Sequence, residues 1–145
     1  MGEAIYYAKV RFESQEKAEE SLPKVEAFLK RMSEAEDKWQ ETRDGGKDAD
    51  DARRLEFPEV YLALKLPKPE NEFSNYCAGK LSSPYGQEYW EIRTDGDCIL
   101  FSGTVWHFAD WEPLMDAMKQ CFGAIVAGYL SDEYAETDIY SQISV

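Results

Sequence analysis

The residues of this sequence that could perform acid–base or nucleophilic chemistry are one histidine, three cysteines and many carboxylates. His107 is the only histidine, and a catalytic base needs a nucleophile within hydrogen-bonding reach. Cys98 precedes it on what we predict to be the same strand, but with opposite parity, so the two side chains point to opposite faces. His107 is therefore a candidate catalytic base without an identified nucleophile, and a hydrogen-bonded structural histidine is the simpler interpretation.

The cysteine spacing and the sequence motifs predict no metal and no cofactor. Cys77, Cys98 and Cys121 form no Cys-x-x-Cys pair, and their odd number argues against a disulfide framework, so we interpret them as reduced thiols. The acidic stretch from Asp44 lacks the calcium-loop spacing, since its glycines come too early and its twelfth residue is Leu55. The sequence contains no P-loop, dinucleotide-binding, nucleophile-elbow or zinc-protease motif.

A β-hairpin is the element that positions most of the remaining candidates. Asp95-Gly96 separates two alternating stretches and suits the two-residue loop of a type I′ turn. Trp90, Ile92, Ile99 and Phe101 then share the face that we predict to be the core side. The other face is mixed polar and apolar and carries Tyr89, Glu91, Arg93, Cys98, Leu100, Ser102, Thr104 and Trp106.

The segments before the hairpin predict two strands and one helix. Residues 4–12 alternate like a strand, and a helix capped by Ser14 extends to Trp39, with a kink or a second start at Pro23. We expect a flexible acidic loop at 42–54. Residues 55–66 alternate and predict a half-buried strand, followed by a long irregular segment, 67–86.

The segments after the hairpin predict one helix and one further strand. Asp110 is a natural N-cap and Gly123 a helix stop, and residues 124–130 form an apolar strand-like stretch. We expect 131–145 either to add an edge strand or to stay mobile.

The order of elements is therefore β-α-β-β-β-α-β in one domain, 1–145. With right-handed crossovers, both helices fall on one face of an antiparallel-rich sheet. We predict an α+β fold of the ferredoxin-like α/β plait type, to which the C-terminal segment adds an edge strand if it joins the sheet.

The charge balance limits the classes of partner. The net charge is −13, and residues 87–145 hold 11 acidic side chains against Arg93 and Lys119. Binding to nucleic acid is disfavoured because it depends on basic side chains. No apolar run has the length of a membrane span, and the N-terminus lacks the features of a signal peptide, so we expect a cytoplasmic protein that does not bind membranes.

The first functional hypothesis is a small acidic protein-binding module that engages a basic partner, in the manner of an inhibitor or immunity-type protein. Tyrosine and tryptophan are frequent in interface cores, and the candidate exposed rings are Tyr89, Trp106, Tyr129, Tyr134 and Tyr140. The simpler alternative is that the helices or the terminal segment cover these rings. The predicted partner-binding residues are aromatic or acidic: Tyr89, Glu91, Trp106, Asp132, Glu133, Tyr134, Glu136 and Asp138.

Two alternatives belong to other classes. One is a small enzyme or ligand-binding domain with a pocket near His107 and the 67–86 loop, to which Tyr85 would also contribute. The other is a homo-oligomer whose open sheet faces pair, which makes the aromatic surface structural. The sequence favours a non-enzymatic role, because no residue set identifies a reaction.

Overall fold

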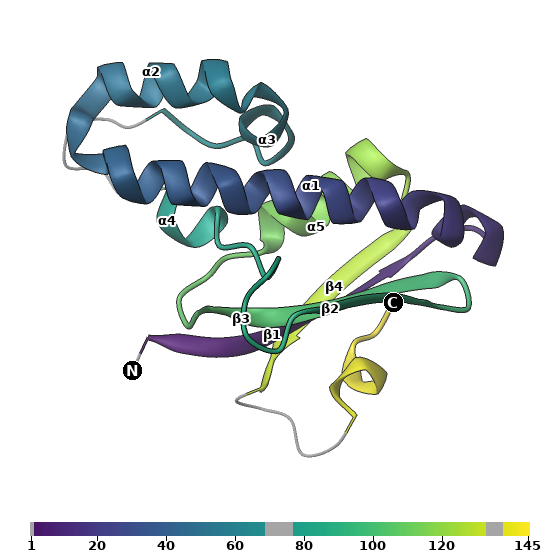
Figure 1. The fold of residues 1–145 in the computed structure, drawn as a ribbon. Helices are drawn as coiled ribbons and strands as arrows, with labels where there is room; N and C mark the ends of the chain where they lie inside the picture. The colour runs from purple at the N-terminus through teal and green to yellow at the C-terminus, as the bar shows by residue number, and fades with distance from the viewer. Residues whose placement is uncertain (1, 69–76, 133–137) are drawn as a thin grey trace.

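A four-stranded antiparallel sheet is the centre of the fold. The structure is a computed structural model that describes residues 2–68, 77–132 and 138–145, with the backbone alone at 77 and 78. The strands lie in the order β2-β3-β1-β4. Their bounds are β1 (Glu3–Arg11), β2 (Glu91–Asp95), β3 (Cys98–Trp106) and β4 (Val126–Ser131). The chain therefore has the predicted α+β architecture with an antiparallel sheet (Figure 1).

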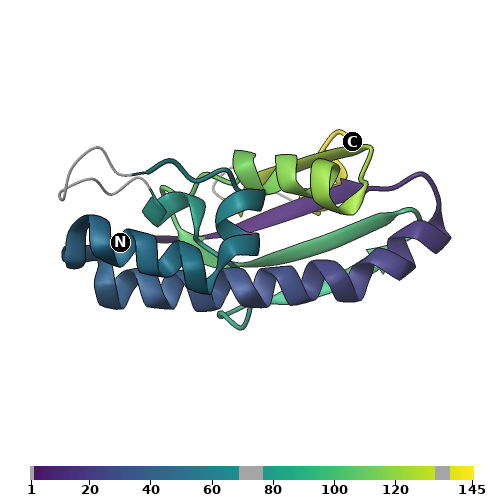
Figure 2. The ribbon, with the colours of Figure 1, turned by 90° about the horizontal axis from the view of Figure 1, so that it is seen from above.

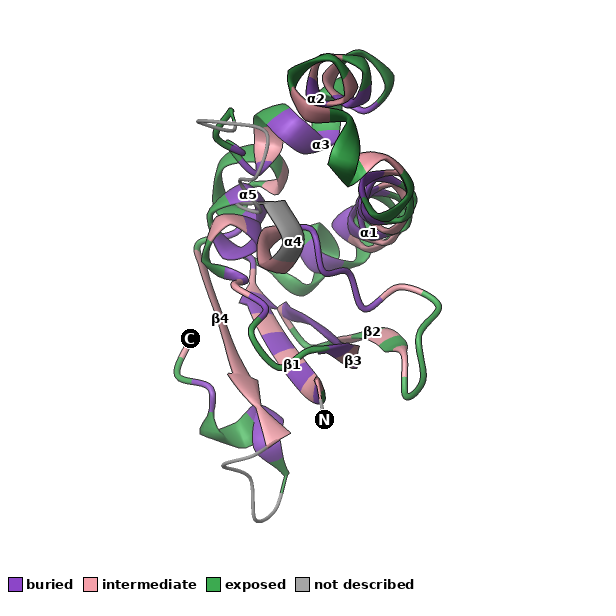
Figure 3. Cartoon of the chain, turned by 90° about the vertical axis from the view of Figure 1, so that its left-hand side faces the viewer, coloured by how far each residue is buried: buried purple, intermediate pink, exposed green. Residues whose placement is uncertain are grey.

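The principal helices all lie on one face of this sheet. α1 (Gln15–Thr42) and α5 (Glu112–Phe122) rest on the sheet, while α2 (Gly46–Glu56) and α3 (Pro58–Ala63) stack on them farther away (Figures 1 and 3). Seen from above, α1 extends along the length of the sheet (Figure 2). Shorter helical turns are η1 (Arg43–Gly45), α4 (Cys77–Lys80) and η3 (Ile139–Gln142).

The stretch 55–66, which its alternating leucines predict to be a strand, is helical. It contains the end of α2 and all of α3, and the leucines at 55 and 62 are 84% and 77% exposed. Pro58 occupies the first turn of α3, where its missing N–H costs little. The buried side chains follow helical spacing: Phe57, Val60, Tyr61 and Leu64. The strand prediction was wrong, and the described part of the chain has one strand fewer than predicted.

The segment 42–54, predicted to be a solvated loop, is also helical and forms η1 and most of α2. Buried charged side chains hold it in place. Arg53 donates to Thr42 Oγ1 over 2.7 Å, and Asp50 accepts from Arg54 Nε over 2.8 Å. The loop prediction was wrong because these polar contacts leave no apolar pattern in the sequence, although Asp50 and Arg53 are both buried.

The hairpin of β2 and β3 forms as predicted, but its turn lies one residue later. Asp95 pairs with Cys98, so the loop consists of Gly96 and the aspartate that follows it. Gly96 has a φ of +60°, the sign required at the first central position of a type II′ turn. The faces are unchanged by this shift, since Ile92 now pairs with Phe101 and both still pack against the core.

The start of α1 agrees with the prediction, and one of the two alternatives at Pro23 is excluded. The Ser14 hydroxyl accepts from the Lys17 N–H over 3.1 Å and caps the helix. α1 then continues through Pro23 as one helix and does not start a second time there. Packing of its long apolar face against the sheet outweighs the loss of one backbone hydrogen bond.

The ends of α5 lie close to their predicted places. Trp111 is the N-cap residue, and the Asp110 carboxylate just before it accepts from the Glu112 N–H over 3.1 Å. Gly123 ends the helix with a left-handed φ of +79°.

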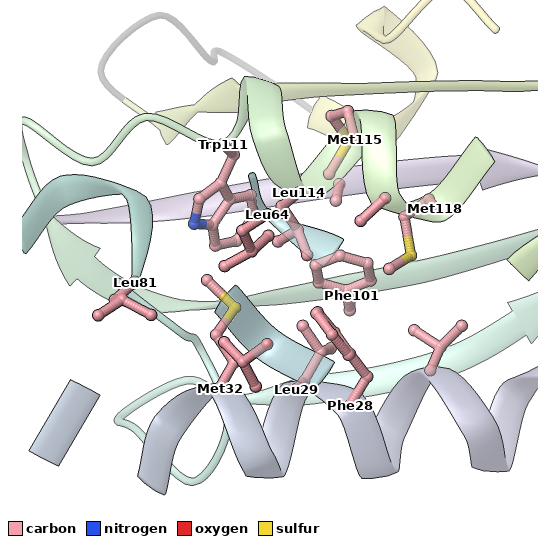
Figure 4. Close-up of a cluster of buried hydrophobic side chains, with 14 of the residues drawn as sticks. Phe28, Leu29, Met32, Leu64, Leu81, Phe101, Trp111, Leu114, Met115 and Met118 are labelled. Atoms are coloured by element: carbon pink, nitrogen blue, oxygen red, sulfur yellow. The ribbon is translucent and has the colours of Figure 1, made fainter. Parts of the chain in front are cut away.

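The main hydrophobic core fills the space between the sheet and the helices (Figure 4). Trp111 is fully buried at its centre, and its indole N–H donates to the Ser82 carbonyl over 2.8 Å. Leu29 and Met32 approach from α1 and Phe101 from β3 (Figure 4). These contacts attach both helices, and the segment around Ser82, to one side of the sheet.

The C-terminal segment, residues 138–145, lies on the opposite face of the sheet (Figure 1). Its first part forms η3, and within the described residues it does not join the sheet as a strand. Tyr140 and Ile143 are buried against Cys98 and Leu100 of β3. The expected edge strand is therefore absent from this part of the segment, which packs on the sheet through its side chains instead.

Candidate functional site

A cavity of about 240 Å³ lies between the C-terminal half of α1, the segment 82–87 and the ends of β1 and β3. We call it the Glu36 cavity. Its described lining is mostly polar and consists of Glu3, Glu36, Asp37, Gln40, Ser82, Ser83, Gln87, Thr104, Val105 and Trp106. No lysine, arginine or histidine is among these lining residues, so the cavity is acidic.

The periodicity of α1 places Glu36 on the apolar side of the helix. Leu29, Met32 and Trp39 occupy the same stripe, at seven and four residues before it and three after it. As a result only 8% of Glu36 remains exposed. A carboxylate in this position has left most of its water shell, so its environment decides whether it keeps its charge.

Burial is the main cause of an altered acidity at Glu36. Burial raises the pKa of this carboxyl, a hydrogen bond from the Ser83 backbone lowers it, and the nearby charge of Asp37 raises it, so that the net pKa is about 7. Within the part of the chain that the structure describes, no cation forms an ion pair with Glu36. Glu36 can therefore exchange a proton near neutral pH or attract a positive group.

One wall of the cavity is formed by Ser82 and Ser83, and hydrogen bonds fix this serine wall to α1 and β3. The Ser83 hydroxyl donates to the Leu29 carbonyl over 2.7 Å, and the Trp106 N–H donates to Ser82 Oγ over 3.4 Å. Gly103 permits the close approach of Pro84, since a Cβ on it would lie 2.6 Å from the Pro84 Cβ. The wall is thus attached to α1 and β3 at the same time.

Exposed aromatic rings lie beside the cavity. Trp106 lines it with 37% exposure, and its ring stacks on that of Phe108 with centroids 5.8 Å apart. Phe108 itself is 53% exposed. The site therefore combines carboxylates with an indole face, and both groups attract cations.

His107 does not line the cavity, although it follows Trp106 directly. Its ring is exposed and lies edge-on to Phe108. The backbone N–H of His107 donates to the Gly2 carbonyl over 2.7 Å. The Tyr6 hydroxyl donates to its carbonyl over 3.0 Å. Both hydrogen bonds are made by the backbone of His107, so they do not orient its imidazole. Tyr85, the other candidate from the pocket hypothesis, packs on Trp90.

The described residues of the predicted partner surface lie in different places. Tyr89 is 66% exposed, and Trp106 borders the cavity. Glu91, Asp132 and Asp138 instead make hydrogen bonds within the chain. They accept, in that order, from the Tyr140 hydroxyl, the Ile5 N–H and the Tyr140 N–H. Glu133, Tyr134 and Glu136 lie outside the described residues.

Of the candidate exposed rings, one is buried and one is half-buried. Tyr140 is 7% exposed, and Tyr129 stacks on Tyr6 with centroids 5.6 Å apart and lies near Trp111. The alternative of a covered ring is therefore correct for Tyr140 and partly met by Tyr129, which is half-buried. The exposed aromatic side chains near the acidic site are Trp106 and Phe108.

A second hollow, between α1 and α2, is a weaker candidate because both basic side chains of its described lining already have acidic partners and that lining is mostly exposed. Arg31 donates to Glu59 over 2.6 Å and pairs with Glu34 over 3.1 Å. Lys38 lies 3.9 Å from Glu56. Exposed pairs of this kind contribute little to binding or stability.

Sequence reasoning missed Glu36, the central residue of the cavity. The available signal was a carboxylate on the apolar stripe of the longest predicted helix, where a charge is costly unless it is paired.

Across the described residues, no group of three or more histidine, cysteine, aspartate or glutamate side chains is arranged to hold a metal ion. None of the described helices has the length and apolar character needed to cross a membrane. Comparisons with family models, with curated protein sequences and with solved structures gave no significant match for this chain.

Proposed function

We propose that this protein is a binding module for a basic protein partner, and that the Glu36 cavity accepts a cationic side chain of that partner. The observation that supports this most strongly is the buried carboxyl of Glu36 in a cavity whose described lining contains two more acids, Glu3 and Asp37, and no base. A cation that enters the cavity stabilises the ionised form of Glu36 and replaces the water lost on burial.

Arginine suits the cavity better than lysine. Its guanidinium is planar, so it can stack on the Trp106 ring and still donate to a carboxylate at its edge. It also keeps its charge when desolvated, whereas a lysine ammonium loses its proton more readily. The net charge of −13 would steer such a partner towards the protein at low ionic strength.

We extend the proposal to the kind of binding protein and to its cellular location. An acidic module that covers a basic active site would act as an inhibitor or immunity-type protein. We place it in the cytoplasm, where an exposed free thiol such as Cys121 stays reduced.

For the fold, we propose a ferredoxin-like plait of four strands. The sheet order β2-β3-β1-β4 and the position of α1 and α5 on one face support this assignment, with α2 and α3 as an insertion after α1.

A ligand-binding or enzymatic role is the second candidate, favoured by the pKa of about 7 at Glu36. A carboxyl with that acidity can act as a general acid or base at neutral pH. An uncharged polar ligand that binds the cavity as well as a cation does would support this alternative against the first proposal. Direct pairing of the open sheet faces of two copies has less support, because residues 138–145 already cover part of that face.

The test is a titration of isotope-labelled protein with blocked pentapeptides that carry arginine or its uncharged isostere citrulline between glycines. We expect the arginine peptide to shift the Trp106 indole signal and to bind at least about tenfold more tightly than the citrulline peptide, or about 1.4 kcal/mol. The Glu36→Gln variant should lose this preference. Glu20→Gln, an exposed site on the same helix, is the charge-matched control.

Equal binding of both peptides would contradict the proposal, as would an arginine preference that Glu36→Gln retains. Weaker arginine binding at higher salt is also expected, since screening reduces the attraction between charges.

A further inference from the structure

The outer face of the sheet, opposite the helices, has its own small hydrophobic cluster. Tyr140 and Ile143 from the C-terminal segment are 7% and 5% exposed there, packed against Cys98 and Leu100 of β3. Tyr7, Leu130 and Val145 border the cluster. It is distinct from the main core, which lies between the sheet and the helices. The face therefore has a surface that fits a tyrosine and an isoleucine three residues apart.

Polar contacts fix the tyrosine at a defined point of this face. Its hydroxyl donates to Glu91 Oε1 over 2.8 Å, and its carbonyl accepts from Lys9 Nζ over 3.4 Å. The Arg93 guanidinium lies 5.7 Å from the ring centroid, and the Tyr7 ring meets it edge-on at 5.3 Å. The four strand residues thus recognise the ring, the hydroxyl and the backbone of Tyr140 separately.

A glycine in β4 makes room for the isoleucine. A Cβ on Gly128 would lie 3.1 Å from Ile143 Cγ2 and 3.5 Å from Val145 Cγ1. Any larger side chain at this position would compete with Ile143 for the same space. The site therefore selects for side-chain shape at both of its anchor residues, Tyr140 and Ile143.

The segment that fills this site has its own local structure. The Asp138 carboxylate accepts from the Tyr140 N–H over 3.2 Å, and the Asp138 carbonyl accepts from the Ser141 hydroxyl over 2.7 Å. The Ile143 N–H donates to the Tyr140 carbonyl over 3.3 Å. This turn presents both anchors to the sheet without strand pairing by the described residues, so side chains supply most of its attachment.

We propose that the outer face is a peptide-binding site for a tyrosine-x-x-isoleucine segment, and that residues 138–145 of a second copy of this chain can occupy it when the resident segment leaves. The fit of the resident segment is the fit that an identical segment would have in trans. Exchange of an identical element between copies needs no new complementarity. This site is independent of the Glu36 cavity.

The test uses the full-length chain with Tyr140→Ala and Ile143→Ala and a fluorescent peptide of residues 138–145, followed by anisotropy. A tethered segment has a local concentration in the millimolar range. Its competition therefore raises the apparent dissociation constant of a free peptide, taken as about 0.1 mM without competition, by about tenfold. We therefore expect the double variant to bind the peptide at least about tenfold more tightly than the wild-type chain.

The controls separate specific recognition of the two anchor side chains from non-specific binding of the peptide. A peptide with alanine at both anchor positions should not bind, and Gly128→Val added to the double variant should abolish binding by filling the isoleucine site. Near-ultraviolet circular dichroism of the main-core tryptophans checks that the variants are folded, and Tyr140→Ser alone replaces the double variant if it is not. Equal binding by wild type and variant, no binding by the folded variant, or binding of the alanine peptide would overturn the proposal.

Discussion

Replacing Glu36 with glutamine should stabilise the protein at neutral pH and above, and should have a much smaller effect near pH 5. Burial first, and then the charge of Asp37, raise the pKa of Glu36 from 4.5 to about 7. In the unfolded chain the same carboxyl ionises near its ordinary pKa. Between these two values the folded protein holds a proton that the unfolded chain has released, so stability falls as the pH rises through this interval.

The magnitude follows from the difference between the two pKa values of Glu36. A change from 4.5 to about 7 corresponds to about 3 kcal/mol of stability, which is fully present below the lower value and lost above the higher one. Glutamine resembles the protonated carboxyl and can still accept from the Ser83 N–H. The gain of Glu36→Gln over wild type should grow from under about 1 kcal/mol at pH 5 to about 3 kcal/mol at pH 8.

Urea unfolding followed by tryptophan fluorescence at several pH values measures this gain, because Trp39 and Trp111 are buried and report on the core. Thermal unfolding at pH 8 should show an increase in Tm of about 5 to 10 °C for a protein of this size. Glu20→Gln should show no such trend. A Glu36→Gln gain that stays constant between pH 5 and pH 8 would refute the argument that Glu36 is buried without a cation.

Three further substitutions test the packing around the site and the helical insertion. Arg53→Ala should cost about 3 kcal/mol in urea unfolding, because it leaves the buried Asp50 carboxylate with fewer partners, and a loss under about 1 kcal/mol would contradict the buried network. Gly103→Ala should lower Tm through a cost of about 1–3 kcal/mol, since its methyl would overlap Pro84, and an unchanged Tm would mean that the serine wall lies farther from β3. Gly123→Ala should cost about 1 kcal/mol in urea unfolding because of its positive φ, and a stabilising effect would exclude the left-handed cap.

The sequence was sufficient for the elements whose apolar pattern is strong and local. The alternation in β1 predicts the strand, the alternation in the hairpin predicts its core face correctly, and the stripe along α1 predicts the longest helix. The register of the hairpin was not predictable from Asp95-Gly96 alone, because two turn types use glycine at neighbouring positions. The structure has the turn with glycine at the first central position, Gly96. In this turn the Asp97 carbonyl accepts from the Phe12 N–H over 2.8 Å.

The insertion and the site were harder to predict because tertiary contacts decide them. The exposed Leu55 and Leu62 imitate the alternation of a strand, while the buried positions between them follow a helix. Asp50 and Arg53 are polar in sequence and buried in the structure. The Glu36 cavity assembles residues from four separate segments, so only the position of Glu36 on an apolar stripe gave a local indication of it.

The central claim, that the Glu36 cavity binds a cation, is tested most directly by following the side-chain carboxyl of Glu36 in a carbon-13 magnetic resonance titration. Without ligand, the account predicts a pKa of about 7 for this carboxyl. With the arginine peptide bound, the positive charge should lower that pKa, while the citrulline peptide should leave it unchanged. Titration at the ordinary value of a glutamate, or a pKa that the arginine peptide does not lower, would contradict the account.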